Sequence, residues 1–376
     1  MSRKMNLLVA AGIAASVVSV SSIAGITVYK DGEKYLKVGG RIQLQYHDNE
    51  FKNGSADESS LFFRRFRPYI EGSLHKDWKG KFQWDMGKAD LSVKDAYMQY
   101  KGFSNMKVTV GNANFPFSRE FLTSSKKQQL VERSFVGDHN YGTPDRQTGI
   151  HLTGHNDGKD ITWGFSAALA ALDPDQKKLD FDTVINNSAS DWNEGWMVGG
   201  RVDFHPFGKL KFSQGDFKGE QKATIGIAAF TWSNDGQNNT AGAGKPDVDK
   251  VNAFEVSGAY RNSGFSIDAE YNRFSADTVT AGYTGGIFKS GSTKLVNYSV
   301  EGGYMVVPAK LELVAAYQVQ DADNYASEWT RTSVGLNWFI HKHDIKVQTT
   351  YRMGENENGV ANKDGDEVFV QAQYVF

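Results

Sequence analysis

Residues 35–47 read YLKVGGRIQLQYH, and this stretch decides the fold. One parity holds Leu36, Val38, Gly40, Ile42, Leu44 and Tyr46, and the other holds Lys37, Gly39, Arg41, Gln43, Gln45 and His47. Successive side chains of a β-strand point to opposite faces of the sheet, whereas a helix needs apolar residues three and four positions apart. The stretch therefore predicts a strand with one apolar face and one polar face.

The same alternation recurs along the chain, for example in ITWGFSAAL (161–169), GFSIDAEYN (264–272) and the final EVFVQAQYVF (367–376). We expect about sixteen strands of about ten residues, the length that a tilted strand needs to cross a bilayer. Short turns such as RNSG (261–264) alternate with longer polar segments such as 275–293. This layout, with a last strand that ends on an aromatic residue, predicts an all-β, transmembrane antiparallel β-barrel.

A soluble β-sandwich is the alternative fold, because its strands show the same alternation when one face packs on a second sheet. The length of the strands, the aromatic residues near strand ends and the persistence of the pattern over the whole chain favour the membrane barrel.

The N-terminus has the features of an export signal. A short basic start precedes an apolar, small-residue core, and Ser22-Ile23-Ala24 supplies small residues for cleavage. We therefore expect a signal peptide over 1–24 and an outer-membrane β-barrel over 25–376, in the cell outer membrane of a Gram-negative organism. A membrane anchor is the alternative interpretation of residues 1–24.

The composition excludes several classes of protein. The chain has 376 residues, with 42 Lys and Arg against 44 Asp and Glu, so it lacks the basic excess typical of nucleic-acid binding. It has no cysteine, which excludes disulfides and thiolate metal sites. Neither HExxH nor GxSxG occurs, so we expect no enzyme activity, no catalytic residues, no metal and no cofactor.

The stretch LFFRRFRPYIEG (61–72) concentrates three arginines among aromatic residues. Strand parity predicts that Arg65 and Arg67 point into the lumen. Arg64 falls on the apolar parity, and we expect it at the outer rim, since an arginine on the lipid face at mid-bilayer costs about 2–4 kcal/mol.

Arg41 shares the inward parity, and guanidinium groups that line a narrow aqueous passage attract anions and bind oxyanions with two parallel hydrogen bonds. The alternative is that these arginines pair with inward carboxylates and only rigidify the wall. Candidate acidic pore-lining partners are Glu71, Asp85 and Asp95.

Residues 112–146 form the longest break in the alternation and contain Phe115, Phe117, Phe121 and Leu122. We expect this segment to fold into the lumen as a constriction loop, with its aromatic residues on the inner wall. Its polar edge, which includes Lys126 and Lys127, would then face the narrowest point. A solvated surface loop is the alternative.

The stretches FFRRFRPYIEGSLHKDWKGKFQWDMG (62–87), VKDAYMQY (93–100), VTVGNANFPFS (108–118) and LTSSKKQQLVERS (122–134) resemble the phosphate-selective porin O/P family in order and spacing. The resemblance implies a sixteen-stranded barrel, a homotrimer and an inward-folded loop. It further implies that Arg65 and Arg67 belong to a ladder of arginines. One of Lys126 or Lys127 would be the lysine at the constriction, with Asp95 as an acidic residue opposite it.

We therefore expect an outer-membrane porin for passive diffusion of small hydrophilic solutes, with a preference for small inorganic or organic anions such as phosphate. Its other partners would be outer-membrane lipid and lipopolysaccharide. Later strands carry inward carboxylates, which predicts a transverse field and only a weak anion preference; these are Glu255, Asp268, Glu270, Glu301 and Glu312. The alternatives are a structural barrel and a non-selective or weakly cation-selective pore.

Overall fold

The computed structural model describes residues 25–52, 57–173, 178–186, 193–236 and 247–376. The signal peptide expected over residues 1–24 lies outside the described residues. Within the described parts, no helix is long enough and apolar enough to cross a bilayer.

In the described parts of the chain, twenty strands make up one sheet. Those of the N-terminal half are β1 (Ile26–Asp31), β2 (Lys34–Gly39), β3 (Arg41–Phe51), β4 (Glu58–Phe66), β5 (Tyr69–Ser73), β6 (Trp78–Asp85), β7 (Ser92–Tyr100), β8 (Met106–Asn114), β9 (Arg146–His155) and β10 (Ile161–Asp173). The remaining strands are β11 (Asp180–Asp182), β12 (Asn193–Phe204), β13 (Lys222–Asn234), β14 (Val248–Asn262), β15 (Phe265–Thr278), β16 (Ser292–Val307), β17 (Leu311–Ala322), β18 (Trp329–His341), β19 (Ile345–Glu355) and β20 (Gly365–Val375). The short helical turns are η2 (Gly87–Ala89), α2 (Arg119–Leu122), η3 (Ser125–Lys127), η4 (Val184–Asn186) and η5 (Glu357–Gly359).

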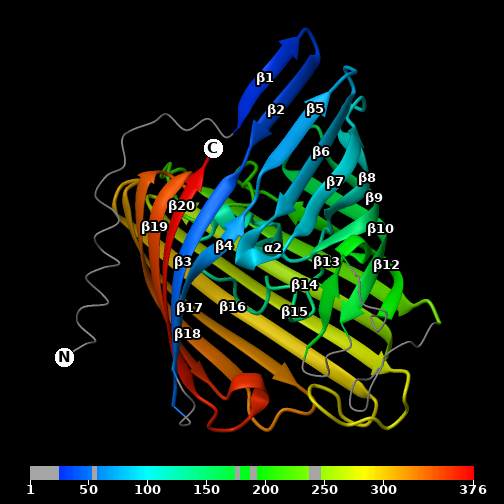
Figure 1. Cartoon of the computed structure of the whole chain (residues 1–376), viewed down its shortest axis with the longest axis vertical. Coiled ribbons are helices and arrows are strands. Elements are labelled where there is room, and N and C mark those ends of the chain that lie inside the picture. The colour runs from blue at the N-terminus through cyan, green and yellow to red at the C-terminus, as the bar shows by residue number, and fades with distance from the viewer. Residues whose placement is uncertain (1–24, 53–56, 174–177, 187–192, 237–246) are drawn as a thin grey trace.

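Antiparallel ladders connect the strands in chain order, from β5 and β6 through β19 and β20, with β11 as a short side branch on β10. The last strand, β20, pairs with β3 over Val375↔Arg41 to Gly365↔Phe51. The long strands therefore wrap round a common interior, and the β1–β2 hairpin protrudes at the end where the chain terminates (Figure 1).

The expected number of about sixteen strands is corrected to twenty among the residues that the structure describes. Two of the additional strands are short: among the described residues, β1 pairs only with β2, and β11 pairs only with β10. Gly40 separates β2 from β3, and Arg67-Pro68 separates β4 from β5. Proline has no backbone N–H for a ladder, so a break at Pro68 follows from the sequence.

The wall is not a closed ladder over its full height. β5 pairs with β6, but β6 ends at Asp85, and the turn η2 lies beside β4 instead of a strand. The amide of Met86 donates to the carbonyl oxygen of Phe66 at 2.9 Å. Among the described residues, β4 forms a ladder only with β3.

Side-chain burial is inverted relative to a soluble β-protein. Large apolar side chains face outward: Ile225 and Ile227 on β13 are both 59% exposed, and Trp196 on β12 is 60% exposed. Polar side chains such as Asn297 and Gln348 are buried. A sandwich would bury its apolar face, so this arrangement favours the membrane barrel over the soluble alternative.

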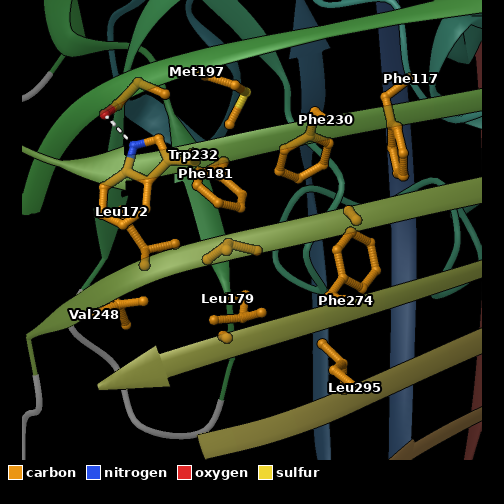
Figure 2. Packing of buried hydrophobic residues seen from close by; sticks show 14 of the residues in the cluster. Phe117, Leu172, Leu179, Phe181, Met197, Phe230, Trp232, Val248, Phe274 and Leu295 are labelled. Carbon is orange, nitrogen blue, oxygen red and sulfur yellow. Dashed lines mark hydrogen bonds between the residues drawn. The ribbon is translucent and has the colours of Figure 1, made fainter. Parts of the chain in front are cut away.

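An apolar cluster fills part of the interior. Phe115 and Phe117, which follow β8, are fully buried with Phe230, Trp232 and residues of β10 to β16. Figure 2 shows the rings of Phe117, Phe230 and Trp232 within this cluster, with the Trp232 indole donating to the carbonyl oxygen of Ala170 at 3.2 Å. This cluster holds the segment between β8 and β9 against one side of the interior and leaves room on the opposite side.

Candidate functional site

A cavity of about 830 Å³ lies between the segment 115–145 and the inner face of the first half of the sheet. Seven of the eight side chains singled out from the sequence line it; they are Arg41, Arg65, Arg67, Lys126, Glu71, Asp85 and Asp95. Lys127 is not among the lining residues. The cavity is therefore the place where the expected pore residues meet.

Strand pairing brings three arginines together on one patch of wall. Arg41 and Arg67 exchange two backbone hydrogen bonds, of 3.2 and 2.9 Å. Two residues further along the strand, Gln43 is opposite Arg65, and its Oε1 accepts a hydrogen bond from the Arg65 guanidinium at 3.2 Å.

A β-bulge changes the expected parity of the arginine stretch. The register shifts so that Gln43 pairs with Arg65 while Leu44 pairs with Phe63, which leaves Arg64 as the extra residue. Phe63 is 51% exposed and faces outward. Unbroken alternation from Arg65 would point Phe63 inward, but a bulge moves all residues beyond it to the other parity.

The expectation that Arg64 faces the lipid at the outer rim is also wrong. Arg64 lines the cavity. Its Nε and Nη2 donate to the two carboxylate oxygens of Glu132, in the segment 115–145, at 2.5 and 3.0 Å. Such two-pronged pairs are the strongest hydrogen-bonded form of an arginine–carboxylate contact.

Each expected acidic residue holds a basic partner. Asp85 accepts from Arg67 Nε at 2.6 Å, and Asp95 contacts both Lys81 at 2.5 Å and Arg146 at 2.6 Å. Glu71 contacts Lys79 at 3.2 Å and accepts a hydrogen bond from the Tyr35 hydroxyl. The carboxylates are thus neutralised by bases of the wall.

Of the expected cations that line the cavity, Arg41, Arg65 and Lys126 have no ion-pair partner in the described parts of the chain. Arg41 is 6% exposed and donates to the Ser124 hydroxyl at 2.9 Å, and Arg65 is 3% exposed. The Nε atoms of both arginines are buried without a hydrogen-bond partner among the described residues. Buried cations of this kind need a compensating anion.

Lys126 lies on η3, within the segment 115–145. Burial, followed by the nearby charge of Arg41, lowers the pKa of its ammonium group to about 8. The charge of Lys126 is therefore lost as the pH rises through that value, so its contribution to anion binding is greatest at lower pH. Lys127 lies beside it but uses its backbone carbonyl oxygen to accept from the amide of Gln214 at 3.0 Å.

The acidic residues of the later strands lie apart from the cavity. Beneath the segment 115–145, the four glutamates are buried and Asp268 is partly buried. Two of the five pair with arginines: Glu255 contacts Arg201 at 2.6 Å, and Asp268 contacts Arg119 at 3.1 Å. None of the five lines the cavity. The transverse field expected across the lumen is therefore not a property of this passage.

A second inward segment, residues 205–221 between β12 and β13, was missed from the sequence. Gln214 makes most of the contacts between this segment and its surroundings. Besides the bond to Lys127, the side-chain Oε1 of Gln214 accepts from the backbone amide of Gln129 at 2.8 Å, and the Gln214 carbonyl oxygen contacts His343 Nε2 at 2.9 Å. The sequence signal was the loss of alternation together with Pro206, Gly208, Gly215 and Gly219. This segment braces the segment 115–145 from the side of the short turns.

Comparison with known proteins places the chain among porins. The family described as phosphate-selective porin O and P matches residues 36–376. Porin O of Pseudomonas aeruginosa is 24% identical and is aligned over 92% of this chain and 89% of its own length.

Two solved structures share the fold. The anion-selective porin from Comamonas acidovorans superposes with a TM-score of 0.61 at 13% identity, over 92% of this chain and all of that chain. The trimer form of in-vitro folded OmpT, an outer-membrane protein of Vibrio cholerae, gives a TM-score of 0.55 at 13% identity, over 91% and 99% of the two chains.

Proposed function

Because the chain belongs to the phosphate-selective porin O and P family, we propose that it is an outer-membrane pore through which small anions diffuse passively. One observation supports this most strongly. Arg41, Arg65 and Lys126 line one cavity without an ion-pair partner among the described residues, while Glu71, Asp85 and Asp95 are all paired with bases. The residual field along this passage is positive.

The chemistry of these groups suits small oxyanions as well as halides. A guanidinium group offers a planar set of N–H donors that matches two oxygens of a carboxylate or phosphate. The guanidinium groups of Arg41 and Arg65, the hydroxyl of Ser124 and the ammonium of Lys126 would replace part of the hydration shell of the anion. Of the two candidate lysines, Lys126 is the one that lines the cavity.

We also propose that the protein is a homotrimer in lipid and lipopolysaccharide of the outer membrane. The trimer form of the OmpT structure with the same fold supports this assembly. The short strands β5 to β8 and the incomplete ladder beside β4 make that part of the wall the least self-sufficient, since an unpaired strand edge needs cover.

The test is conductance in a planar bilayer across a potassium chloride gradient. The wild type should give a chloride-favouring reversal potential, and phosphate should reduce the chloride current. In the double variant Arg41→Gln plus Arg65→Gln, the loss of charge-assisted hydrogen bonds worth about 1.5–3 kcal/mol each should weaken phosphate block at least about tenfold.

Lys127→Gln is the matched control, because Lys127 adjoins Lys126 but does not line the cavity. It should retain the chloride preference and the phosphate block. A wild-type reversal potential near zero or on the cation side, unchanged in the double variant, would contradict the anion pore and support a general pore. Absence of conductance would support a structural barrel.

A further inference from the structure

Glu132 has an unusual position among the carboxylates of the cavity. Its two oxygens receive Arg64 Nε and Nη2 at 2.5 and 3.0 Å, and Oε1 also accepts from Gln45 Nε2 at 3.0 Å. The three donors come from β3 and β4, whereas Glu132 is carried into the lumen by the segment 115–145. The wall therefore presents a ready set of donors, and a side chain from elsewhere in the chain occupies it.

The charges around Glu132 keep it ionised. Burial alone would raise the pKa of its carboxyl group, but Arg64 and then Arg65 outweigh burial and hold the pKa well below the usual range. Arg65, next to Arg64 on the bulge, has a buried Nε without a partner among the described residues. The position thus accommodates a full negative charge beside two guanidinium groups.

Asp85, another carboxylate of the cavity, is integrated into the wall in a way that Glu132 is not. Asp85 accepts backbone N–H donors from Phe66 and Gly87 at 3.1 Å each, in addition to Arg67. The hydrogen bonds of Glu132 with described residues all come from the side chains Arg64 and Gln45. Side-chain donors of the wall can exchange one carboxylate for another without disturbing a strand.

Contacts other than those of Glu132, some within the segment 115–145 and some with the wall, also hold this loop. Arg133 donates through Nη2 to the carbonyl oxygens of Phe121 and Thr123 at 3.1 and 3.0 Å. The aromatic cluster around Phe115 and Phe117 anchors the same segment further along. Holding the loop in place therefore does not depend on the Glu132 carboxylate alone.

We propose that Arg64, Arg65 and Gln45 form an anion position of the pore, and that Glu132 is a tethered carboxylate that occupies it in competition with small carboxylate solutes. This inference rests on the proposed function and deepens it. It assigns a class of solute, small mono- or dicarboxylates, and a residue that limits how tightly the pore holds them. Removing the tethered carboxylate frees Arg64 for the solute.

The test is block of the chloride current by added succinate, measured in the reconstituted full-length protein. In Glu132→Gln, the succinate concentration for half-block should fall about tenfold, the order expected for one additional charge-assisted hydrogen bond. Glu132→Asp keeps the net charge but shortens the reach to Arg64, and it should also lower the half-block concentration, by a smaller factor. This second variant covers the case in which Glu132→Gln does not assemble.

Asp138→Asn is the matched control, because Asp138 lies on the same segment and lines the same cavity, but its carboxylate accepts hydrogen bonds from Asn140. If it lowers the half-block concentration as much as Glu132→Gln does, and Glu132→Asp matches the wild type, the effect is one of net charge and the inference fails. The double variant Arg64→Gln plus Glu132→Gln should return the half-block concentration toward the wild-type value.

These outcomes are distinguishable from failure of the proposed function. A wild type without chloride preference, unchanged by Arg41→Gln plus Arg65→Gln, overturns the anion pore. A second outcome overturns only the tethered carboxylate. In it the wild type prefers chloride, but the half-block concentration of succinate is the same in Glu132→Gln as in Asp138→Asn, and the same in Glu132→Asp as in the wild type.

Discussion

Arg41 and Arg67 lie on neighbouring strands and exchange backbone hydrogen bonds, yet their guanidinium groups have different partners. Arg67 is held by the Asp85 carboxylate at 2.6 Å, whereas Arg41 has the Ser124 hydroxyl at 2.9 Å. An ion pair leaves little charge for a solute, and a hydroxyl leaves nearly all of it. At the residue scale, the charge of the pore is therefore set by the pairing of each cation rather than by the number of arginines.

The lowered pKa of the Lys126 ammonium group predicts that the anion selectivity of the pore depends on pH. Because the pKa of Lys126 is lowered to about 8, chloride preference should decline as the pH rises through that value and the ammonium loses its proton. The measurement is the reversal potential in a potassium chloride gradient at several pH values. Chloride is a suitable probe because its own charge does not change with pH.

Lys126→Gln should remove this pH step, and Lys127→Gln should preserve it. Sulfate in the bath should move the step of the wild type to higher pH, since an anion that binds the protonated lysine favours that form. A step that persists in Lys126→Gln would assign the titration to another group.

At the element scale, two inward segments act on one another. The segment 115–145 carries Ser124 and Lys126, and the segment 205–221 contacts it through Gln214, which is 3% exposed. The bonds from Gln214 reach Lys127, Gln129 and His343. The height of Lys126 in the pore therefore depends on a segment that does not line the cavity itself.

Gln214→Ala should loosen this brace. Loss of the side-chain acceptor leaves the Gln129 amide unpaired, at a cost of about 1–3 kcal/mol, so we expect noisier and larger single-channel currents. Because Gln214 is a positioning residue, the pH step of Lys126 should also shift or broaden. Lys218→Ala, on the same segment with a side chain 73% exposed, is the control and should match the wild type. If the pH step is unaltered in Gln214→Ala, Gln214 stabilises the fold but does not position Lys126.

At the scale of the whole molecule, the outward face of the sheet is the part that meets lipid. On β13 the exposed positions run from Ile225 and Ile227 through Thr231 to Ser233, from apolar toward polar. This gradient places Ile227 nearer the middle of the hydrocarbon layer and Ser233 nearer a rim.

The two ends of this gradient predict different costs for an added charge. Ile227→Arg should destabilise the folded barrel by about 2–4 kcal/mol, and Ser233→Arg by no more than about 1 kcal/mol. The measurement is reversible denaturant unfolding in lipid vesicles. Equal costs for the two substitutions would contradict the placement of β13 in the bilayer.

Strand parity predicted that Arg41, Arg65 and Arg67 share one face of the sheet, because the pleat of a strand is a local property with a period of two residues, and all three line the cavity. The resemblance to the phosphate-selective porin O and P family is confirmed by the match over residues 36–376. The all-β class followed from the same alternation.

The inward position of Arg64, the particular bases that pair with Asp85 and Asp95, the burial of most of the later carboxylates and the fold of residues 205–221 did not follow from the pattern. A bulge depends on which strand lies alongside, and an ion pair depends on side chains that are distant in sequence, such as Arg64 and Glu132. The order of residues thus decides which faces of the strands are polar. Only the tertiary structure decides which of those polar groups remain available to a solute. The reason is that a buried charge is neutralised by an ion-pair partner, and such partners are distant in sequence and meet only when strands and loops close round one interior.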